Sequence, residues 1–197
     1  MKSNRLILFT FLLLANLGVR AQTNYTLSSE TAEMIVDGSS TVSDWSVSIR
    51  KAKGNFLIID NFKIEIGASL YSNLKFEFLV DEMESGRGPI MNNKVKKALK
   101  SSEHPMVNYN STENKIVSVK DKSFVLESKG EIEIGGLKKP FSFLLNCSYN
   151  EEMKTISFEG NKDITMSMFN IVRPTAFFGK LKTMDGLNVK FNMSFTK

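Results

Sequence analysis

The chain has 197 residues, in which 26 lysine and arginine residues outnumber 21 aspartate and glutamate residues and histidine occurs once. A single histidine excludes a metal site built from several histidines and leaves little basis for a serine–histidine–aspartate triad, so we expect no metal, no cofactor and no enzymatic activity. Basic residues form no stripe, and the net charge of +5 falls to about +2 without the N-terminal segment described next, so nucleic acid is not an expected partner.

The N-terminal residues have the features of an export signal. Two basic residues precede an apolar run at 6–17, which is about the length of a signal-peptide core and shorter than the roughly 20 residues of a membrane span. Residues 19–21 suit a cleavage site. We therefore expect a signal peptide at 1–21, a single domain at 22–197, no transmembrane segment, and a periplasmic or secreted location.

Alternating polar and apolar residues predict strands in most of the remaining chain. The clearest runs are 75–80, 131–134, 141–145 and 189–195, and turn signals such as Gly135-Gly136 separate them. The residues assigned to the inner face are bulky: Phe76, Phe78, Phe124, Leu126, Phe141, Phe143, Phe158, Phe191 and Phe195. Strands with one wet face and one apolar face predict an all-β, antiparallel fold.

One segment departs from this pattern and predicts a short amphipathic helix near residues 89–100. Pro89 suits a first helical turn, and lysines gather toward the C-terminal end, where the helix dipole favours cations. The apolar face is formed by Met91, Val95, Ala98 and Leu99. We expect this face to lie against the open end of the sheet, with the helix ending before His104-Pro105 and His104 in a packing role.

Three further side chains are of types that take part in catalysis, and for each we expect a structural role instead. Cys147 is the only cysteine, so it forms no internal disulfide and is expected to be a half-buried free thiol. Glu131 and Glu133 share a strand face and are spaced for acid–base chemistry. Because their isoleucine neighbours mark the opposite face as core, we expect both carboxylates to face water.

Residues 37–45 (DGSSTVSDW), 84–105, 130–140 and 166–174 carry motifs in the order found in the YceI-like family, which the chain resembles. Residues 37–45 are similar to the family's G-T-S-T-L-H-D-W opening, and 84–105 resemble its short helix carrying A-L-K before a His-Pro step. Residues 130–140 (GEIEIGGLKKP) resemble its hairpin, and 166–174 (MSMFNIVRP) its S-D-F-G-I-x-x-P motif. Residues 175–183 (TAFFGKLKT) match a segment that we associate with Bacteroidetes-type members.

The resemblance implies an extended, lipocalin-like antiparallel β-barrel with a helix near its mouth, which binds a long isoprenoid lipid inside. The side chains expected to line that cavity are Trp45, Phe76, Phe78, Phe141, Phe143, Phe158, Met166, Phe177 and Phe178. Three positions depart from the family pattern: Ser43 replaces a histidine, Met168 an aspartate and Asn170 a glycine. If those positions contact a head group, they imply a less polar ligand or a different binding mode.

Two functions remain open from the sequence. The first is a periplasmic carrier or storage protein for an apolar, isoprenoid-type lipid. The alternative is a non-enzymatic envelope or stress-related interaction module with a packed core, in which Phe177 and Phe178 form a surface contact. Fifteen phenylalanines and ten methionines suit a packed core and a cavity wall equally.

Overall fold

The computed structural model describes residues 22–28, 32–59 and 62–197, so the predicted signal peptide at 1–21 lies outside the described residues. The strands are β1 (Gln22–Leu27), β2 (Glu33–Ser40), β3 (Asp44–Ile49), β4 (Ala52–Ile59), β5 (Tyr71–Leu79), β6 (Met83–Glu84), β7 (Met106–Lys120), β8 (Ser123–Ile134), β9 (Leu137–Asn150), β10 (Thr155–Thr165), β11 (Thr175–Ala176) and β12 (Leu181–Thr196). The helical elements are η1 (Val80–Glu82), α1 (Pro89–Ala98) and η2 (Ser167–Phe169).

Hydrogen bonds between the first and last strands close the sheet into a barrel. Eight strands follow one another around the wall in the order β1-β4-β5-β7-β8-β9-β10-β12, and all neighbours are antiparallel. β1 returns to β12 through the pairs Thr26–Thr196 and Leu27–Phe195. Closure leaves this end without a free sheet edge.

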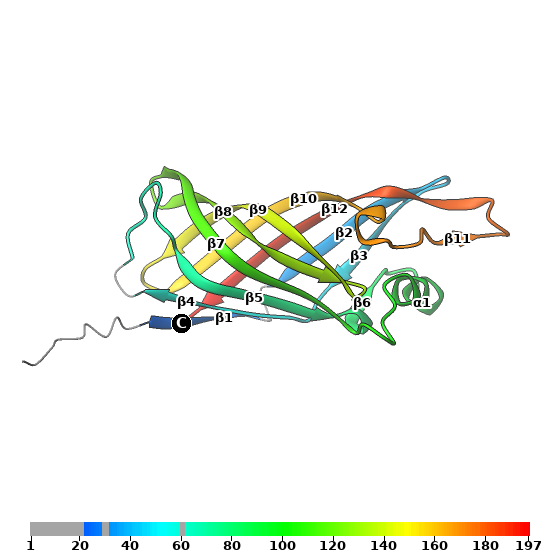
Figure 1. Ribbon diagram of the computed structural model, residues 1–197, viewed down its shortest axis with the longest axis horizontal. Helices are drawn as coiled ribbons and strands as arrows, with labels where there is room; N and C mark the ends of the chain where they lie inside the picture. The colour runs from blue at the N-terminus through cyan, green and yellow to red at the C-terminus, as the bar shows by residue number, and fades with distance from the viewer. Residues whose placement is uncertain (1–21, 29–31, 60–61) are drawn as a thin grey trace, which may run out of the picture.

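Toward the other end of the barrel, β2, β3 and β6 take over the wall positions of β1, β4 and β5. β12 pairs with β2, β2 with β3, and β3 with β6. Only Arg50 and Lys51 separate β3 from β4, and η1 joins β5 to β6. These paired segments make the barrel long, with α1 at one end and the C-terminus at the other (Figure 1). The predicted extended, all-β antiparallel barrel is thereby confirmed.

α1 also confirms its prediction, beginning at Pro89 and covering the end of the barrel next to β6 (Figure 1). Its apolar side chains Val95 and Leu99 pack against the barrel core. On its outer side, Lys96 Nζ lies 3.5 Å from the Asp81 carboxylate. This exposed ion pair contributes little to stability, so apolar packing holds the helix in place.

The turn between β8 and β9 is the tight hairpin that the sequence predicted. Gly135 and Gly136 both adopt left-handed backbone angles, with φ of 56° and 80°, as the commonest two-residue hairpin turns require. A Cβ on Gly136 would lie 2.4 Å from the His104 ring. His104 therefore packs on this turn, as expected, and ties the end of the helical segment to the hairpin.

The side chains of Cys147, Glu131 and Glu133 occupy positions with no catalytic partner among the described residues. Lys138 Nζ lies 3.8 Å from Glu131 and 3.9 Å from Glu133, on the outer surface, which confirms that both carboxylates face water. Cys147 is more buried than expected, with only 3% of its surface exposed. Burial raises the pKa of its thiol, so the unreactive protonated form is favoured.

An aromatic cluster fills the barrel end opposite α1. The Phe56 ring is fully buried and stacks on Tyr25 with their ring centres 5.4 Å apart. The ring centres of Phe195 and Phe158 lie 5.0 and 5.6 Å from that of Phe56. Because these rings come from β1, β4, β10 and β12, the cluster seals this end where β1 and β12 meet.

Candidate functional site

The half of the barrel next to α1 encloses a cavity of about 190 Å³. Its wall combines inward-facing residues of β2, β3, β5, β7, β8, β9, β10 and β12 with the apolar face of α1 and with Phe169 of η2. Most lining side chains are apolar. The lining residues that carry polar side-chain groups are Trp45, Lys94, Tyr109, Ser128, Lys162, Thr165 and Thr183.

Most of the residues predicted to line the cavity do so. Seven of the nine candidates come together in its wall: Trp45, Phe76, Phe78, Phe141, Phe143, Phe158 and Met166. The rings of Phe141 and Phe143 meet edge to face with centres 4.9 Å apart, and Phe143 meets Phe191 in the same way at 5.6 Å. These candidates came from period-two alternation or from motif position, and contact of these residues with a ligand stays a prediction.

Phe177 and Phe178, the other two candidates, lie outside the cavity. Phe177 is 72% exposed and Phe178 is fully exposed. β11 pairs with the start of β12 through Thr175–Lys182 and Ala176–Leu181, so the two phenylalanines fall in a turn beyond the barrel wall. Both residues were assigned to the cavity from their position in a sequence motif. A motif does not specify where the chain turns away from the barrel wall.

Several lining residues were missed by the sequence reasoning. Met91 and Val95 of α1 and Leu99 at its C-terminal cap enter the wall, although the helix was predicted to cover this end without being assigned to the cavity. Met34 on β2 and Val189 on β12 also contribute. The alternation of 189–195 was a usable signal for Val189, whereas β2 lacks a clear alternating pattern.

A glycine makes room for Trp45. Gly38 is the cross-strand partner of Trp45, and a Cβ at position 38 would lie 2.3 Å from the indole ring. The indole nitrogen donates a hydrogen bond of 3.1 Å to the Ser39 carbonyl. The ring is therefore held across Gly38 at the end of the cavity near the β2–β3 turn.

The polar centre of the barrel interior is satisfied by its own partners. The Tyr71 hydroxyl donates to Ser128 Oγ at 2.8 Å, and the Tyr109 hydroxyl shares a hydrogen bond of 2.9 Å with the same oxygen. Burial raises the pKa of both tyrosines, so both hydroxyls stay neutral near pH 7. Among the described residues, no buried side-chain nitrogen or oxygen lacks a hydrogen-bond partner.

Two lysines are the charged residues of the cavity wall. Lys94 extends from α1, and the Lys162 ammonium lies 5.5 Å from the centre of the Phe141 ring. No acidic residue lines the cavity, and neither lysine forms an ion pair with any described residue. The cavity wall thus combines mostly apolar side chains with two cationic groups and no acidic one.

β9 and β10 diverge beside the cavity. They pair only over 146–150 and 155–159. Toward α1, β9 stays paired with β8, and β10 stays paired with β12. Over 137–145 and 160–165 the two strands therefore share no hydrogen-bond ladder, and we call this stretch the seam. Side chains, and not a backbone ladder, hold this stretch of the cavity wall together.

The three departures from the family motifs lie away from the cavity lining. Ser43 is in the exposed β2–β3 turn and accepts a hydrogen bond of 3.3 Å from Arg87. Met168 is exposed, and Asn170 ends η2 in the left-handed conformation with φ of 54°. The polarity of the cavity is thus set by other residues.

The chemistry of this arrangement points to binding. Within residues 22–28, 32–59 and 62–197, no group of histidine, cysteine, aspartate and glutamate side chains is placed to hold a metal ion. No helix in the same ranges has the length and hydrophobicity to cross a bilayer. An apolar cavity with two cationic groups is suited to enclosing a largely apolar molecule.

No protein-family model matches the sequence, and no match is found among curated proteins. Solved structures of similar fold are found. BcnA of Burkholderia cenocepacia is 12% identical, with a TM-score of 0.63 over 85% of this chain and 98% of BcnA. A polyisoprenoid binding domain from Saccharophagus degradans is 8% identical, with a TM-score of 0.66 over 87% and 97%. The Campylobacter jejuni YCEI protein is 13% identical, with a TM-score of 0.52 over 74% and 82%. This chain therefore has the fold of the YceI proteins.

Proposed function

We propose that this protein is a YceI-like protein that binds an apolar, isoprenoid-type lipid inside the barrel and serves as a periplasmic carrier or storage protein without enzymatic activity. The observation that carries the proposal is the apolar cavity, since a barrel with only a structural role has no need to keep one end hollow. The ordered sequence motifs and the fold shared with a polyisoprenoid binding domain support the same ligand class.

The size of the cavity constrains how a lipid is held. Its 190 Å³ is below the roughly 300–1,000 Å³ of typical ligand pockets, so a long chain requires lining side chains to move aside. Five methionines are placed to do this: Met34, Met83, Met91, Met166 and Met193. Methionine side chains are flexible and adapt to irregular apolar surfaces. In this proposal the methionine side chains shift to widen the cavity as a long lipid enters.

Apolar burial supplies the affinity. Removing roughly 400 Å² of lipid surface from water gives about 10 kcal/mol at about 25 cal/mol per Å², before the entropy costs of binding. Lys94 and Lys162 add a preference for a lipid whose polar end is anionic, because no acidic side chain in the lining competes for them.

The test is lipid uptake by purified residues 22–197, measured by native mass spectrometry after addition of a polyprenyl lipid and followed by solvent extraction. A stoichiometric adduct is expected. Val189→Trp, which fills the cavity, should abolish uptake, whereas Val117→Trp on the exposed face of β7 should leave it intact. Absence of uptake by the unmodified protein, or equal uptake by Val189→Trp, would contradict the proposal.

The alternative function is an envelope or stress-related interaction module. Exposed Phe177 and Phe178 favour a surface contact, while the cavity argues against the fully packed core that this alternative assumed. Loss of a captured protein partner on Phe177→Ser, together with no lipid uptake by the unmodified chain, would support this alternative.

A further inference from the structure

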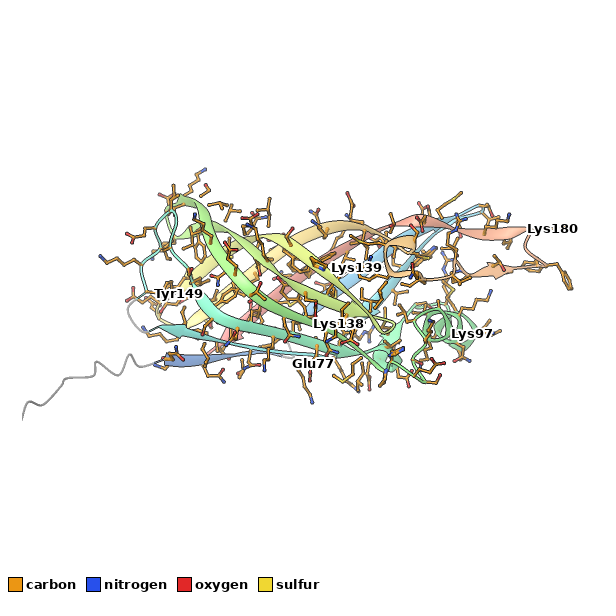
Figure 2. The ribbon with its side chains drawn as sticks, in the orientation of Figure 1. Glu77, Lys97, Lys138, Lys139, Tyr149 and Lys180 are labelled. Carbon is orange, nitrogen blue, oxygen red and sulfur yellow. The ribbon has the colours of Figure 1, made fainter. Side chains whose placement is uncertain are left out.

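A hairpin at the α1 end of the molecule extends beyond the barrel wall. β11 and the start of β12 form it, joined by a turn at 177–180, and we call residues 172–182 the tip. In the described part of the chain, the tip reaches farthest past α1 (Figure 1), and Lys180 lies at its far end (Figure 2). Its shape is a convex projection, which a broad surface approaching this end of the barrel contacts before the wall.

The tip exposes large apolar side chains without covering them. They are Val172, Phe177 and Phe178, of which Val172 is 84% exposed. The β2–β3 turn lies beside the tip, where the Thr41 amide donates a hydrogen bond of 3.0 Å to the Lys182 carbonyl, and it adds exposed Val42. Exposed apolar side chains from two neighbouring turns are therefore gathered at this end.

The charge of the tip has a single sign. Arg173, Lys180 and Lys182 lie within 172–182, and this segment contains no aspartate or glutamate. None of the three lies within ion-pair distance of an acidic side chain among the described residues. The Arg173 charge does reach Asp185, just beyond the tip, where hydrogen bonds from Ser167 and this charge lower the pKa of the carboxyl. Exposed aromatic rings flanked by basic side chains complement an anionic lipid surface, where rings enter the acyl region and cations meet head groups.

The backbone holds the two rings outward. Phe177 and Phe178 adopt left-handed angles, with φ of 48° and 56°, which bulky residues rarely take. Two hydrogen bonds fix the turn, one of 3.1 Å from the Gly179 amide to Ala176 and one of 3.2 Å from the Lys180 amide to Phe177. The hydrogen-bonded turn, with its strained backbone angles, therefore holds both phenylalanine rings in solvent.

The base of the tip is part of the cavity rim. Pro174 and Thr183 line the cavity, and the Thr183 amide and hydroxyl both donate to the Pro174 carbonyl at 3.1 and 3.0 Å. A surface bound to the tip therefore lies next to the end of the cavity that α1 covers. For a lipid-binding barrel, this places the site beside a source of lipid.

We propose that the tip docks the protein on an anionic lipid bilayer, with Phe177 and Phe178 inserted among the acyl chains and Arg173, Lys180 and Lys182 at the head groups. A bilayer fits better than a folded protein partner, because the tip is convex and basic and presents no groove. The proposal concerns the outer surface, so it can fail or succeed independently of lipid uptake into the cavity.

The experiment is co-flotation of residues 22–197 with phosphatidylcholine vesicles that contain or lack phosphatidylglycerol. Binding to the anionic vesicles is expected, and salt should weaken it. Phe177→Ser/Phe178→Ser should weaken binding by roughly a hundredfold, from the loss of two buried rings. Lys180→Gln/Lys182→Gln should weaken it by roughly thirtyfold. Met153→Ser is the matched control, since Met153 is equally exposed in the β9–β10 turn at the opposite end.

Circular dichroism and lipid uptake from detergent solution show whether each variant remains folded. Normal uptake with lost flotation supports the docking role. Failure of the unmodified protein to float with anionic vesicles, or unchanged flotation of the Phe177→Ser/Phe178→Ser variant, overturns it. Self-association that disappears in the same variant, measured by light scattering without vesicles, also overturns it, because a second copy would then cover the tip.

Discussion

Position 38 shows how one missing side chain sets the shape of the site. Gly38 has an ordinary strand conformation, so glycine is not needed here for its backbone freedom. It is needed because the absence of a side chain leaves room for a neighbouring ring. Trp45 occupies that space from the neighbouring strand and is the only tryptophan in the chain. Its indole therefore reports on one end of the cavity without competing signals.

Gly38→Ala should displace the Trp45 ring, because the new methyl group would overlap it. We expect a changed tryptophan emission maximum and weaker lipid uptake, with the barrel still folded. Gly186→Ala is the matched control, since a Cβ there meets no atom within 4 Å. Identical spectra for Gly38→Ala and the unmodified protein would show that the ring is not confined as described.

Loss of the Ser128 hydroxyl should destabilise the barrel interior. Ser128→Ala leaves the hydroxyls of Tyr71 and Tyr109 without their shared partner, at a cost of about 1–3 kcal/mol in the free energy of unfolding. Urea denaturation measures this, with exposed Ser118→Ala as control. Tyr71→Phe/Tyr109→Phe in the Ser128→Ala background should recover part of the loss, and no recovery would argue against the network.

Alkaline pH should destabilise the barrel through the same tyrosines. The folded state raises the pKa of Tyr71 above its ordinary value of 10.0, so only the unfolded chain ionises readily as the pH rises past that value. The contribution of Tyr71 to the unfolding free energy should stay constant below about pH 10 and fall above it. Thermal melts should show a shallower alkaline decline for Tyr71→Phe, and an unchanged decline would assign the effect to other groups.

Among the elements, those set by local pattern were the ones that the sequence could predict. α1 follows from apolar spacing after Pro89, and the β8–β9 turn follows from two consecutive glycines. The tip did not follow, because its departure from the wall depends on pairing between β11 and β12, which residue spacing does not encode. The same limit applies to the cavity, since the same phenylalanines can fill a barrel or surround a space.

The seam should be the least protected part of the wall. β9 residues 137–145 have a paired neighbour on one side only, whereas 146–150 are paired toward β10 as well. Amides of 137–145 that point toward β10 should therefore exchange hydrogen faster than those of 146–150. Residue-resolved NMR exchange measures this, and equal protection along all of β9 would mean that the seam is closed in solution.

On the scale of the whole molecule, the barrel has a packed end and a hollow end. The cluster around Phe56 fills the end where β1 meets β12, and the cavity occupies the end covered by α1. We therefore expect the free energy of unfolding to depend mainly on the packed end of the barrel, and lipid binding to depend mainly on the hollow end. Substitutions in the two halves should separate the two properties.

Phe56→Ala should cost about 3–5 kcal/mol in unfolding free energy, because a fully enclosed ring leaves a void. Phe76→Ala should cost about half of that or less, since Phe76 already borders a cavity, and it should change lipid uptake instead. Chemical denaturation and uptake measured on both variants test the division. Equal losses of stability would mean that the hollow end contributes as much to the fold as the packed end.

β12 has a further consequence for how the molecule is made. It pairs with β10 along one edge and with both β1 and β2 along the other. Among the described strands β12 comes last in chain order, so one edge each of β10, β1 and β2 lacks its partner until residues 181–196 join the sheet. Because unpaired strand edges attract other chains, we expect aggregation to compete with closure of the barrel until β12 is in place.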